Sequence, residues 1–137
     1  FQSAFACLKE VCGRHPDNPY FANTLASTYM KRLRKPLEAI KVLTLSNGQP
    51  RFPNRPENIN TLAAAYNQIG NSNKAIKILT TVDGREKYPS DVKCTNSLAT
   101  SYIRANTPEK AIQLLFPGGR ERFPGDRFCI NRGESQR

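Results

Sequence analysis

A seven-residue motif occurs three times in this 137-residue chain at nearly constant spacing. It reads Asn-Thr-Leu-Ala-Ser-Thr-Tyr at 23–29, Asn-Thr-Leu-Ala-Ala-Ala-Tyr at 60–66 and Asn-Ser-Leu-Ala-Thr-Ser-Tyr at 96–102. The offsets are 60 − 23 = 37 and 96 − 60 = 36 residues. Repetition with a period of about 20 to 50 residues is typical of stacked supersecondary units. The motif therefore constrains the architecture of the chain, although it does not name a partner.

Each unit is predicted to contain two helices. In the middle unit, apolar residues at i, i+3, i+4 and i+7 form one face of the first helix: Ile59, Leu62, Ala63 and Tyr66. Gly70 then interrupts the pattern, and a second helix is predicted with this apolar face: Ala75, Ile76, Leu79 and Val82. Across the three units, the predicted core consists of Leu25, Ala26, Tyr29, Ala39, Ile40, Leu43, Leu62, Ala63, Tyr66, Ala75, Ile76, Leu79, Leu98, Ala99, Tyr102, Ala111, Ile112 and Leu115.

A second motif, Gly-x-x-x-aromatic-Pro, joins each unit to the next. Proline cannot continue a helix and favours extended geometry in the residue before it. Glycine accepts the left-handed conformation that often ends a helix, so these pairs are expected to end the second helices: Asn47–Gly48, Asp83–Gly84 and Gly118–Gly119. The aromatic is expected to fill the seam between units, at Phe52, Tyr88, Phe123 and, before the first unit, His15.

The distance from this proline to the motif asparagine is always seven residues, at 16–23, 53–60, 89–96 and 124–131. We therefore expect one array over residues 1–137, with complete units at 16–52, 53–88 and 89–123. Residues 1–15 are predicted to end a preceding unit, and residues 124–137 to begin a following one. Because arrays need capped ends and neither end shows a capping pattern, the parent protein is expected to be longer.

The motif resembles the tetratricopeptide repeat family, whose pattern is Leu-Gly/Ala-x-x-Tyr on the first helix and Ala-x-x-x-Phe/Leu on the second. The matching positions are Leu25, Ala26, Tyr29, Ala39 and Leu43; Leu62, Ala63, Tyr66, Ala75 and Leu79; and Leu98, Ala99, Tyr102, Ala111 and Leu115. The resemblance implies an all-α, right-handed solenoid of antiparallel helix pairs. The chain is also similar to pentatricopeptide repeats, which bind single-stranded RNA. The link is longer than either family's pattern.

A stripe beside the buried one is the predicted binding face. At 3.6 residues per turn, Asn60, Ala64 and Asn67 share this stripe, with Glu57 and Gln68 next to it. By resemblance to the family, the stripe lines the concave groove of the solenoid. The equivalent residues of the other units are Tyr20, Asn23, Ser27, Met30 and Lys31, and Lys93, Asn96, Thr100, Ile103 and Arg104.

The recurring asparagine has two interpretations. Its side chain offers both a donor and an acceptor, which match the N–H and C=O groups of an extended peptide. Alternatively, each asparagine caps a helix or bridges neighbouring helices near the first turn. The residues alone do not separate these readings at Asn23, Asn60, Asn96 and Asn131.

The net charge of +10, with a pI near 9.8, favours an acidic or polyanionic partner. Basic residues gather in the segment 31–35 and in the links between units, where they either contact a partner or form a solvated edge. The link residues are Arg51, Arg55, Arg85, Lys87, Arg120, Arg122 and Arg127.

The sequence shows no pattern for catalysis or metal binding. Cys7, Cys12, Cys94 and Cys129 form no Cys-x-x-Cys pair, and the chain has a single histidine, His15. We expect no enzyme, no metal and no cofactor. The cysteines are expected to be reduced packing residues in an intracellular, cytoplasmic protein. No apolar run is long enough for a membrane span.

Three functions are compatible with these features. The first is a protein-interaction module that holds an acidic or extended partner segment in the concave groove. The second is binding of single-stranded RNA in a pentatricopeptide-like basic groove. The third is self-association through exposed end helices. A steep loss of affinity with added salt would distinguish RNA binding from the first.

Overall fold

The computed structural model describes residues 2–120 and 122. These residues form seven α-helices, a short 3₁₀ helix and two isolated β-bridges, so the described part of the chain is all-α, as predicted. No helix in it is long and apolar enough to cross a membrane. The helices are α1 (Gln2–Arg14), α2 (Pro19–Lys31), α3 (Pro36–Leu43), α4 (Pro56–Gln68), α5 (Ser72–Leu79), α6 (Val92–Arg104) and α7 (Pro108–Leu115), followed by η1 (Pro117–Gly119).

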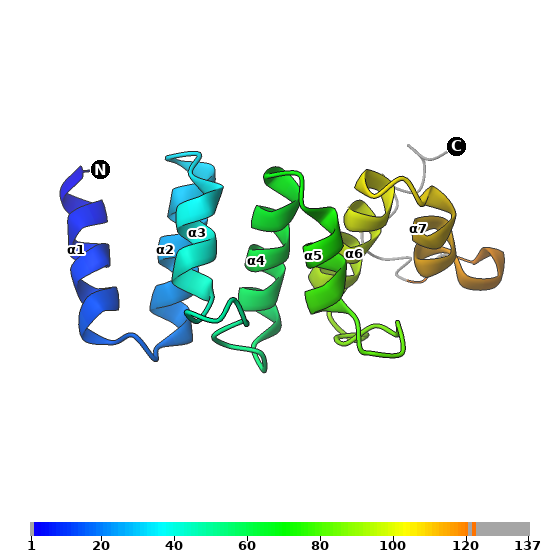
Figure 1. Ribbon diagram of the computed structural model, residues 1–137, viewed down its shortest axis with the longest axis horizontal. Coiled ribbons are helices and arrows are strands. Elements are labelled where there is room, and N and C mark those ends of the chain that lie inside the picture. Colours follow the sequence, from blue (N-terminus) through cyan, green and yellow to red (C-terminus); the bar gives the residue numbers. More distant parts are fainter. Residues whose placement is uncertain (1, 121, 123–137) are drawn as a thin grey trace.

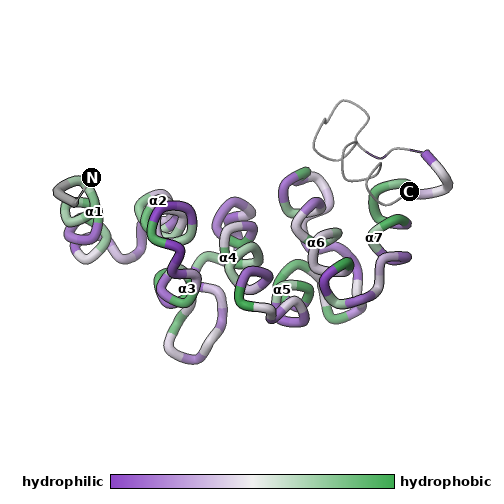
Figure 2. The backbone as a smooth tube through the Cα atoms, turned by 90° about the horizontal axis from the view of Figure 1, so that it is seen from above, coloured by the Kyte–Doolittle hydropathy of each residue, from purple (hydrophilic) through white to green (hydrophobic). Residues whose placement is uncertain are grey.

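The helices follow one another along the long axis of the molecule in the order of the sequence (Figure 1). Each helix from α1 to α7 packs against the next one in the chain. In addition, α2 contacts α4, and α4 contacts α6. Seen from above, α2, α4 and α6 form one row, and α3 and α5 lie in a second row (Figure 2). Residues at equivalent positions of α2, α4 and α6 are therefore brought onto neighbouring helices.

Local sequence signals account for where the helices begin. Asn18 Oδ1 accepts hydrogen bonds from the backbone N–H groups of Tyr20 and Phe21, at 3.0 and 3.1 Å, and so caps α2. Asp91 caps α6 in the same way, with its carboxylate 2.9 Å from the Cys94 nitrogen. Proline, whose fixed φ suits the first turn and which lacks an N–H to satisfy, begins four helices. These prolines are Pro19, Pro36, Pro56 and Pro108.

The turns after α4 and α6 share one geometry, and the turn after α2 is one residue longer, with the Lys35 N–H donating to the Tyr29 carbonyl at 2.7 Å. After α4, the Asn71 N–H donates to the Tyr66 carbonyl at 2.8 Å, and Gly70 between them has φ +87°. This is the Schellman arrangement, in which a left-handed residue lets the chain leave the helix. Gly70 therefore ends the first helix of its pair, as the sequence indicated. The equivalent left-handed residues are Arg34 at φ +53° and Asn106 at φ +68°.

The links between units differ from the prediction. The second helices end at Leu43 and Leu79, five residues before the glycines that were expected to end them. Each link instead folds back on itself in a small hairpin, with bridges Thr44–Pro50 and Thr80–Glu86. Gly48 and Gly84 form the turns of these hairpins at φ +85° and +82°. The reason is that threonine ends each helix in an extended conformation, and its hydroxyl donates to the carbonyl four residues earlier at 2.7 Å.

The other expectations for the links have different outcomes. Val82 lies in the hairpin and is fully exposed, so it does not belong to the apolar face of α5. Gly118 and Gly119 do not end α7 as expected, because α7 ends at Leu115 and the two glycines fall in the following η1. Phe52 and Tyr88 pack against the core as predicted for seam residues, and the Tyr88 hydroxyl donates to the Pro53 carbonyl. His15 is exposed, and Phe123 lies outside the described residues.

Most of the predicted core is buried. Ile40, Ile76 and Tyr102 are half-buried and pack against it. The prediction is wrong for Ile112, which is 42% exposed. The equivalent helices α3 and α5 are each covered by the following helix, whereas α7 packs against α6 and η1. The confirmed residues are Leu25, Ala26, Tyr29, Ala39, Leu43, Leu62, Ala63, Tyr66, Ala75, Leu79, Leu98, Ala99, Ala111 and Leu115.

Candidate partner-binding surface

The predicted binding residues lie on α2, α4 and α6, but they differ in exposure. The charged and large polar ones at the helix ends are exposed, and the residues between them are half-buried. The exposed residues are Tyr20, Lys31, Glu57, Gln68, Lys93 and Arg104. The half-buried residues are Asn23, Ser27, Met30, Asn60, Ala64, Thr100 and Ile103. Asn67 and Asn96 are buried. We call the exposed and half-buried set the α2–α4–α6 face.

Two of the motif asparagines bridge neighbouring helices. The Thr61 hydroxyl of α4 donates to Asn23 Oδ1 of α2 at 2.7 Å. The Ser97 hydroxyl of α6 donates to Asn60 Oδ1 of α4 in the same register. Each amide oxygen is therefore engaged by the residue that follows the motif asparagine on the next helix. This geometry favours the bridging interpretation over a free peptide clamp at these positions.

Asn67 was expected to line the groove, and the structure places it inside the interface between α4 and α6. It is 5% exposed, and its Nδ2 donates to the fully buried Ser101 hydroxyl at 3.0 Å. The Asn67 Oδ1 atom lies 3.1 Å from the same hydroxyl, which also lies 2.8 Å from the Ser97 carbonyl. Because α4 and α6 pack closely along this stretch, the C-terminal end of the predicted stripe turns towards the neighbouring helix.

Asn96 is likewise buried, at 8% exposure. Its Oδ1 atom has no hydrogen-bond partner among the residues that the structure describes. The motif asparagine that would follow it in register, Asn131, lies outside those residues. Asn67 and Asn96 are therefore positioned to support helix packing, and their exposed atoms offer little to a partner.

A second set of contacts ties successive units together, and the sequence reasoning missed one member of it. Asn58 is buried and donates from Nδ2 to the Pro19 carbonyl at 3.0 Å. Cys94 is equivalent to Asn58, since 94 − 58 = 36, and its thiol lies 3.3 Å from the Pro56 carbonyl. Each side chain thus contacts the first residue of the preceding long helix. Asn58 and Cys94 occupy equivalent positions, seven residues before Ala65 and Ser101. The sequence did not show this equivalence, because Asn and Cys differ in chemistry.

Burial controls the chemistry of the cysteines. It raises the pKa of the Cys94 thiol to about 12, and the negative charge of Asp91 contributes. Burial also raises the pKa of Cys12, whose thiol donates to the Phe21 carbonyl at 3.1 Å. Cys7 is exposed, and Cys129 lies outside the described residues. Cys12 and Cys94 therefore act as packing residues. Within residues 2–120 and 122, no group of His, Cys, Asp and Glu side chains is arranged to hold a metal ion.

The α2–α4–α6 face carries more positive than negative charge. Lys31, Lys93 and Arg104 are exposed on it, against the single carboxylate of Glu57. Arg104 is oriented by a hydrogen bond from its guanidinium to the Asn67 carbonyl, at 3.2 Å. In protein interfaces, a positive patch of this kind is complementary to a negative one.

The basic residues of the links are partly neutralised. Arg122 forms an ion pair with Glu86 and also donates to the Pro89 carbonyl at 2.9 Å. Glu86 accepts a further hydrogen bond from the Thr95 hydroxyl at 2.9 Å. This network joins the links on either side of the third unit, so Arg122 has a structural role. Arg55, Arg85, Lys87 and Arg120 are exposed, Arg51 is half-buried, and Arg127 lies outside the described residues.

Comparison with known proteins gives no assignment. No protein-family model matches the chain, and neither a curated protein nor a solved structure matches it. A functional proposal therefore depends on the geometry and charge of the surfaces described above.

Proposed function

We propose that this chain is a protein-interaction module that binds an acidic segment of a partner on the α2–α4–α6 face. The proposal includes the finer architecture expected from the sequence, a right-handed, tetratricopeptide-like solenoid with units at 16–52, 53–88 and 89–123. The observation that carries it is the shared register of the Asn23–Thr61 and Asn60–Ser97 contacts. This register brings equivalent residues of α2, α4 and α6 onto neighbouring helices.

The chemistry of the face selects the kind of segment. Three exposed cations and one carboxylate favour a partner that carries Asp or Glu. The half-buried middle of the face holds small side chains, Ser27, Ala64 and Thr100, which allow a chain to approach closely. The motif asparagines contribute by fixing the helix register. The unpaired thiols of Cys7, Cys12 and Cys94 support the expected intracellular location.

A peptide library displayed on phage and selected against the purified chain tests this function. We expect the enriched peptides to be acidic and to bind more weakly to Lys93→Glu. Lys93 is exposed in the first turn of α6, where a carboxylate is favoured by the helix dipole, so the variant should fold normally. Lys77→Glu makes the same charge change at an exposed position of α5, away from the α2–α4–α6 face, and is the matched control. Peptides that bind both variants as well as they bind the wild type would refute the proposal.

Single-stranded RNA and self-association remain the alternatives. Base stacking needs exposed aromatic side chains, and Tyr20 is the aromatic residue among those predicted to line the face. Titration of a fluorescent poly(U) oligonucleotide with salt tests the first alternative, since phosphate contacts make affinity fall steeply as salt is added. Light scattering over a concentration series tests the second.

A further inference from the structure

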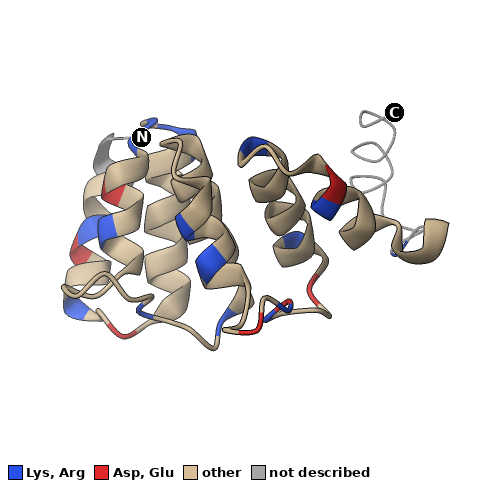
Figure 3. Cartoon of the chain, turned by 45° about the vertical axis from the view of Figure 1, so that its right-hand side comes forward, with Lys and Arg blue, Asp and Glu red and all other residues tan. Residues whose placement is uncertain are grey.

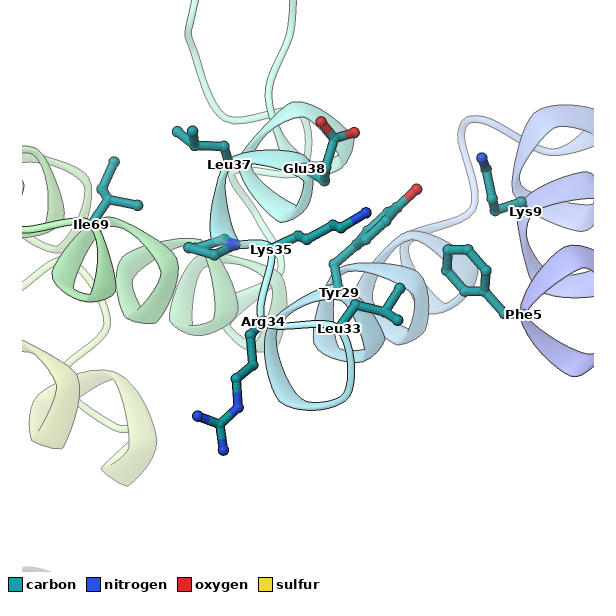
Figure 4. A pocket seen from close by; sticks show the side chains of 10 residues that line it. Phe5, Lys9, Tyr29, Leu33, Arg34, Lys35, Leu37, Glu38 and Ile69 are labelled. Atoms are coloured by element: carbon teal, nitrogen blue, oxygen red, sulfur yellow. The ribbon is translucent and has the colours of Figure 1, made fainter. Parts of the chain in front are cut away.

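A pocket of about 580 Å³ lies between α1 and the turn that joins α2 to α3 (Figure 4). Its volume is within the range of about 300 to 1,000 Å³ that is common for ligand sites. None of the residues that line it belongs to the α2–α4–α6 face. The pocket is therefore a separate surface of the molecule.

Apolar side chains form two parts of its wall. On one side, Phe5 of α1 and Tyr29 of α2 meet edge to face, with ring centroids 5.3 Å apart and an interplanar angle of 83°. On the other side lie Leu37 and Ile69, which are 62% and 39% exposed. Figure 4 shows the Tyr29 ring between Lys35 and Phe5, with Leu37 and Ile69 on the opposite side of Lys35. Burying these exposed side chains under a ligand would be favourable.

The charge of the pocket is positive. Lys9, Arg34 and Lys35 line it against one acid, Glu38, so the lining has a net charge of 3 − 1 = +2. Glu38 is itself 3.4 Å from the Lys41 ammonium, which reduces its effect on an incoming anion. The Lys9 ammonium lies 5.7 Å from the centroid of the Phe5 ring and so remains beside the apolar wall. The turn beside the N-terminus is strongly basic in Figure 3.

The backbone of this turn is strained at the pocket. Arg34 has φ +53°, where a non-glycine residue costs about 1 to 2 kcal/mol. The equivalent positions of the other two units carry residues that tolerate this conformation, Gly70 and Asn106. The arginine is therefore present despite its conformational cost. Strained residues of this kind concentrate at binding and active sites.

We propose that this pocket binds an acidic segment of a partner protein that packs an apolar side chain against Leu37 and Ile69. The apolar side chain is covered by the exposed walls, and the carboxylates of the segment pair with Lys9 and Lys35. Arg34, whose guanidinium points away from the rings in Figure 4, meets the segment outside the pocket. The inference goes beyond the proposed function because it assigns a second binding site on a different surface.

Fluorescence anisotropy tests the inference with a fluorescein-labelled peptide in which Glu and Leu alternate. The double variant Lys9→Glu/Lys35→Glu should bind this peptide about tenfold or more weakly than the wild type, since two attractive charges become repulsive. Leu37→Asn, at an exposed position, should weaken it as well. Lys77→Glu, at an exposed position of α5 that lines neither surface, should leave binding unchanged. Circular dichroism confirms that each variant is folded.

Several results would overturn the inference. It would be wrong if the peptide did not bind the wild type, or if it bound the pocket variants as tightly as the wild type. Equally tight binding of a peptide of alternating Glu and Ser would show that the apolar walls are not used. Displacement of the peptide by a poly(U) oligonucleotide would identify the site as a nucleic-acid surface. Loss of binding in Lys93→Glu, with no loss in the pocket variants, would place the peptide on the α2–α4–α6 face and would support only the proposed function.

Discussion

Asn67 of α4 and Ser101 of α6 are hydrogen-bonded to each other inside the interface between their helices, where both are buried. A buried amide and a buried hydroxyl each need a partner, because leaving either one unsatisfied costs about 1 to 3 kcal/mol. The pair therefore joins α4 to α6, and it fixes which residues of the two helices face each other.

Ser101→Ala should lower the free energy of unfolding by about 1 to 3 kcal/mol, because it leaves the Asn67 amide buried without its partner. Urea denaturation measures this change. The loss in the double variant Asn67→Ala/Ser101→Ala should be smaller than the sum of the losses in the two single variants, since the residues share one contact. Gln68→Ala, an exposed neighbour in the same helix turn, is the control and should change stability by less than about 0.5 kcal/mol. Equal effects for Ser101→Ala and Gln68→Ala would contradict the prediction.

Arg34→Gly should stabilise the chain by about 1 kcal/mol, because glycine adopts the φ of +53° without steric cost. Chemical denaturation of the variant and the wild type under the same conditions measures the difference. Asn106→Gly, at the equivalent turn, should have a smaller effect, since asparagine tolerates the left-handed conformation. A lower stability for Arg34→Gly would show that the turn is not strained as described.

Ala75→Leu should destabilise the chain by about 1 to 3 kcal/mol, because Ala75 is fully buried and the added side chain overpacks the contact of α5 with α4 and α6. Thermal unfolding followed by circular dichroism reports the loss. Lys77→Leu introduces the same side chain two residues away on the exposed side of α5 and controls for the change in hydrophobicity. If both variants melt at the same temperature, Ala75 is not in a packed interface.

Cys94 should resist alkylation by iodoacetamide up to about pH 9, because a buried thiol with its pKa raised to about 12 stays protonated. Exposed Cys7 should react first, and mass spectrometry of proteolytic fragments separates the two sites. The unfolded chain loses this proton at lower pH than the folded chain, so the stabilisation from Cys94 is complete below about pH 8.5 and declines as pH rises towards 12. Rapid labelling of Cys94 without denaturant would contradict this assignment.

The helices and most of the core could be predicted because helical periodicity and capping act over a few residues. Ile112 shows the limit of this reasoning. It follows Lys-Ala in the sequence, as Ile76 does, but only the helix of Ile76 has a further described helix packed beside it. Burial at these positions is decided by the neighbouring helix, which a local pattern does not contain.

Glycine is ambiguous for a similar reason. Helix ends and hairpin turns both require a left-handed residue, so the pairs at 47–48 and 83–84 satisfied either interpretation. Arg34 could not be predicted from its residue type, since arginine carries no turn signal. The offset of 37 residues between the first two motifs points from Gly70 to Leu33, and only alignment of the second helices, Ala39 with Ala75, places Arg34 opposite Gly70.

The candidate surface was predictable as a set of positions, but its hydrogen bonds were not. The recurrence of asparagine at 23, 60 and 96 marks a stripe without specifying what each amide contacts. Thr61 and Ser97 became its partners only when the offset between successive helices was known. The hydrogen bonds that favour bridging at Asn23 and Asn60 therefore depend on tertiary register, which the sequence pattern does not contain.

The small hairpins after α3 and α5 give the chain room to vary in length. Their tips at Asn47 and Asp83 lie outside the helices and are exposed. Lengthening a surface loop costs little conformational entropy, because the cost grows only with the logarithm of loop length. An epitope tag or a foreign peptide inserted at either tip should leave the helices in place, which makes these tips natural attachment points for engineering.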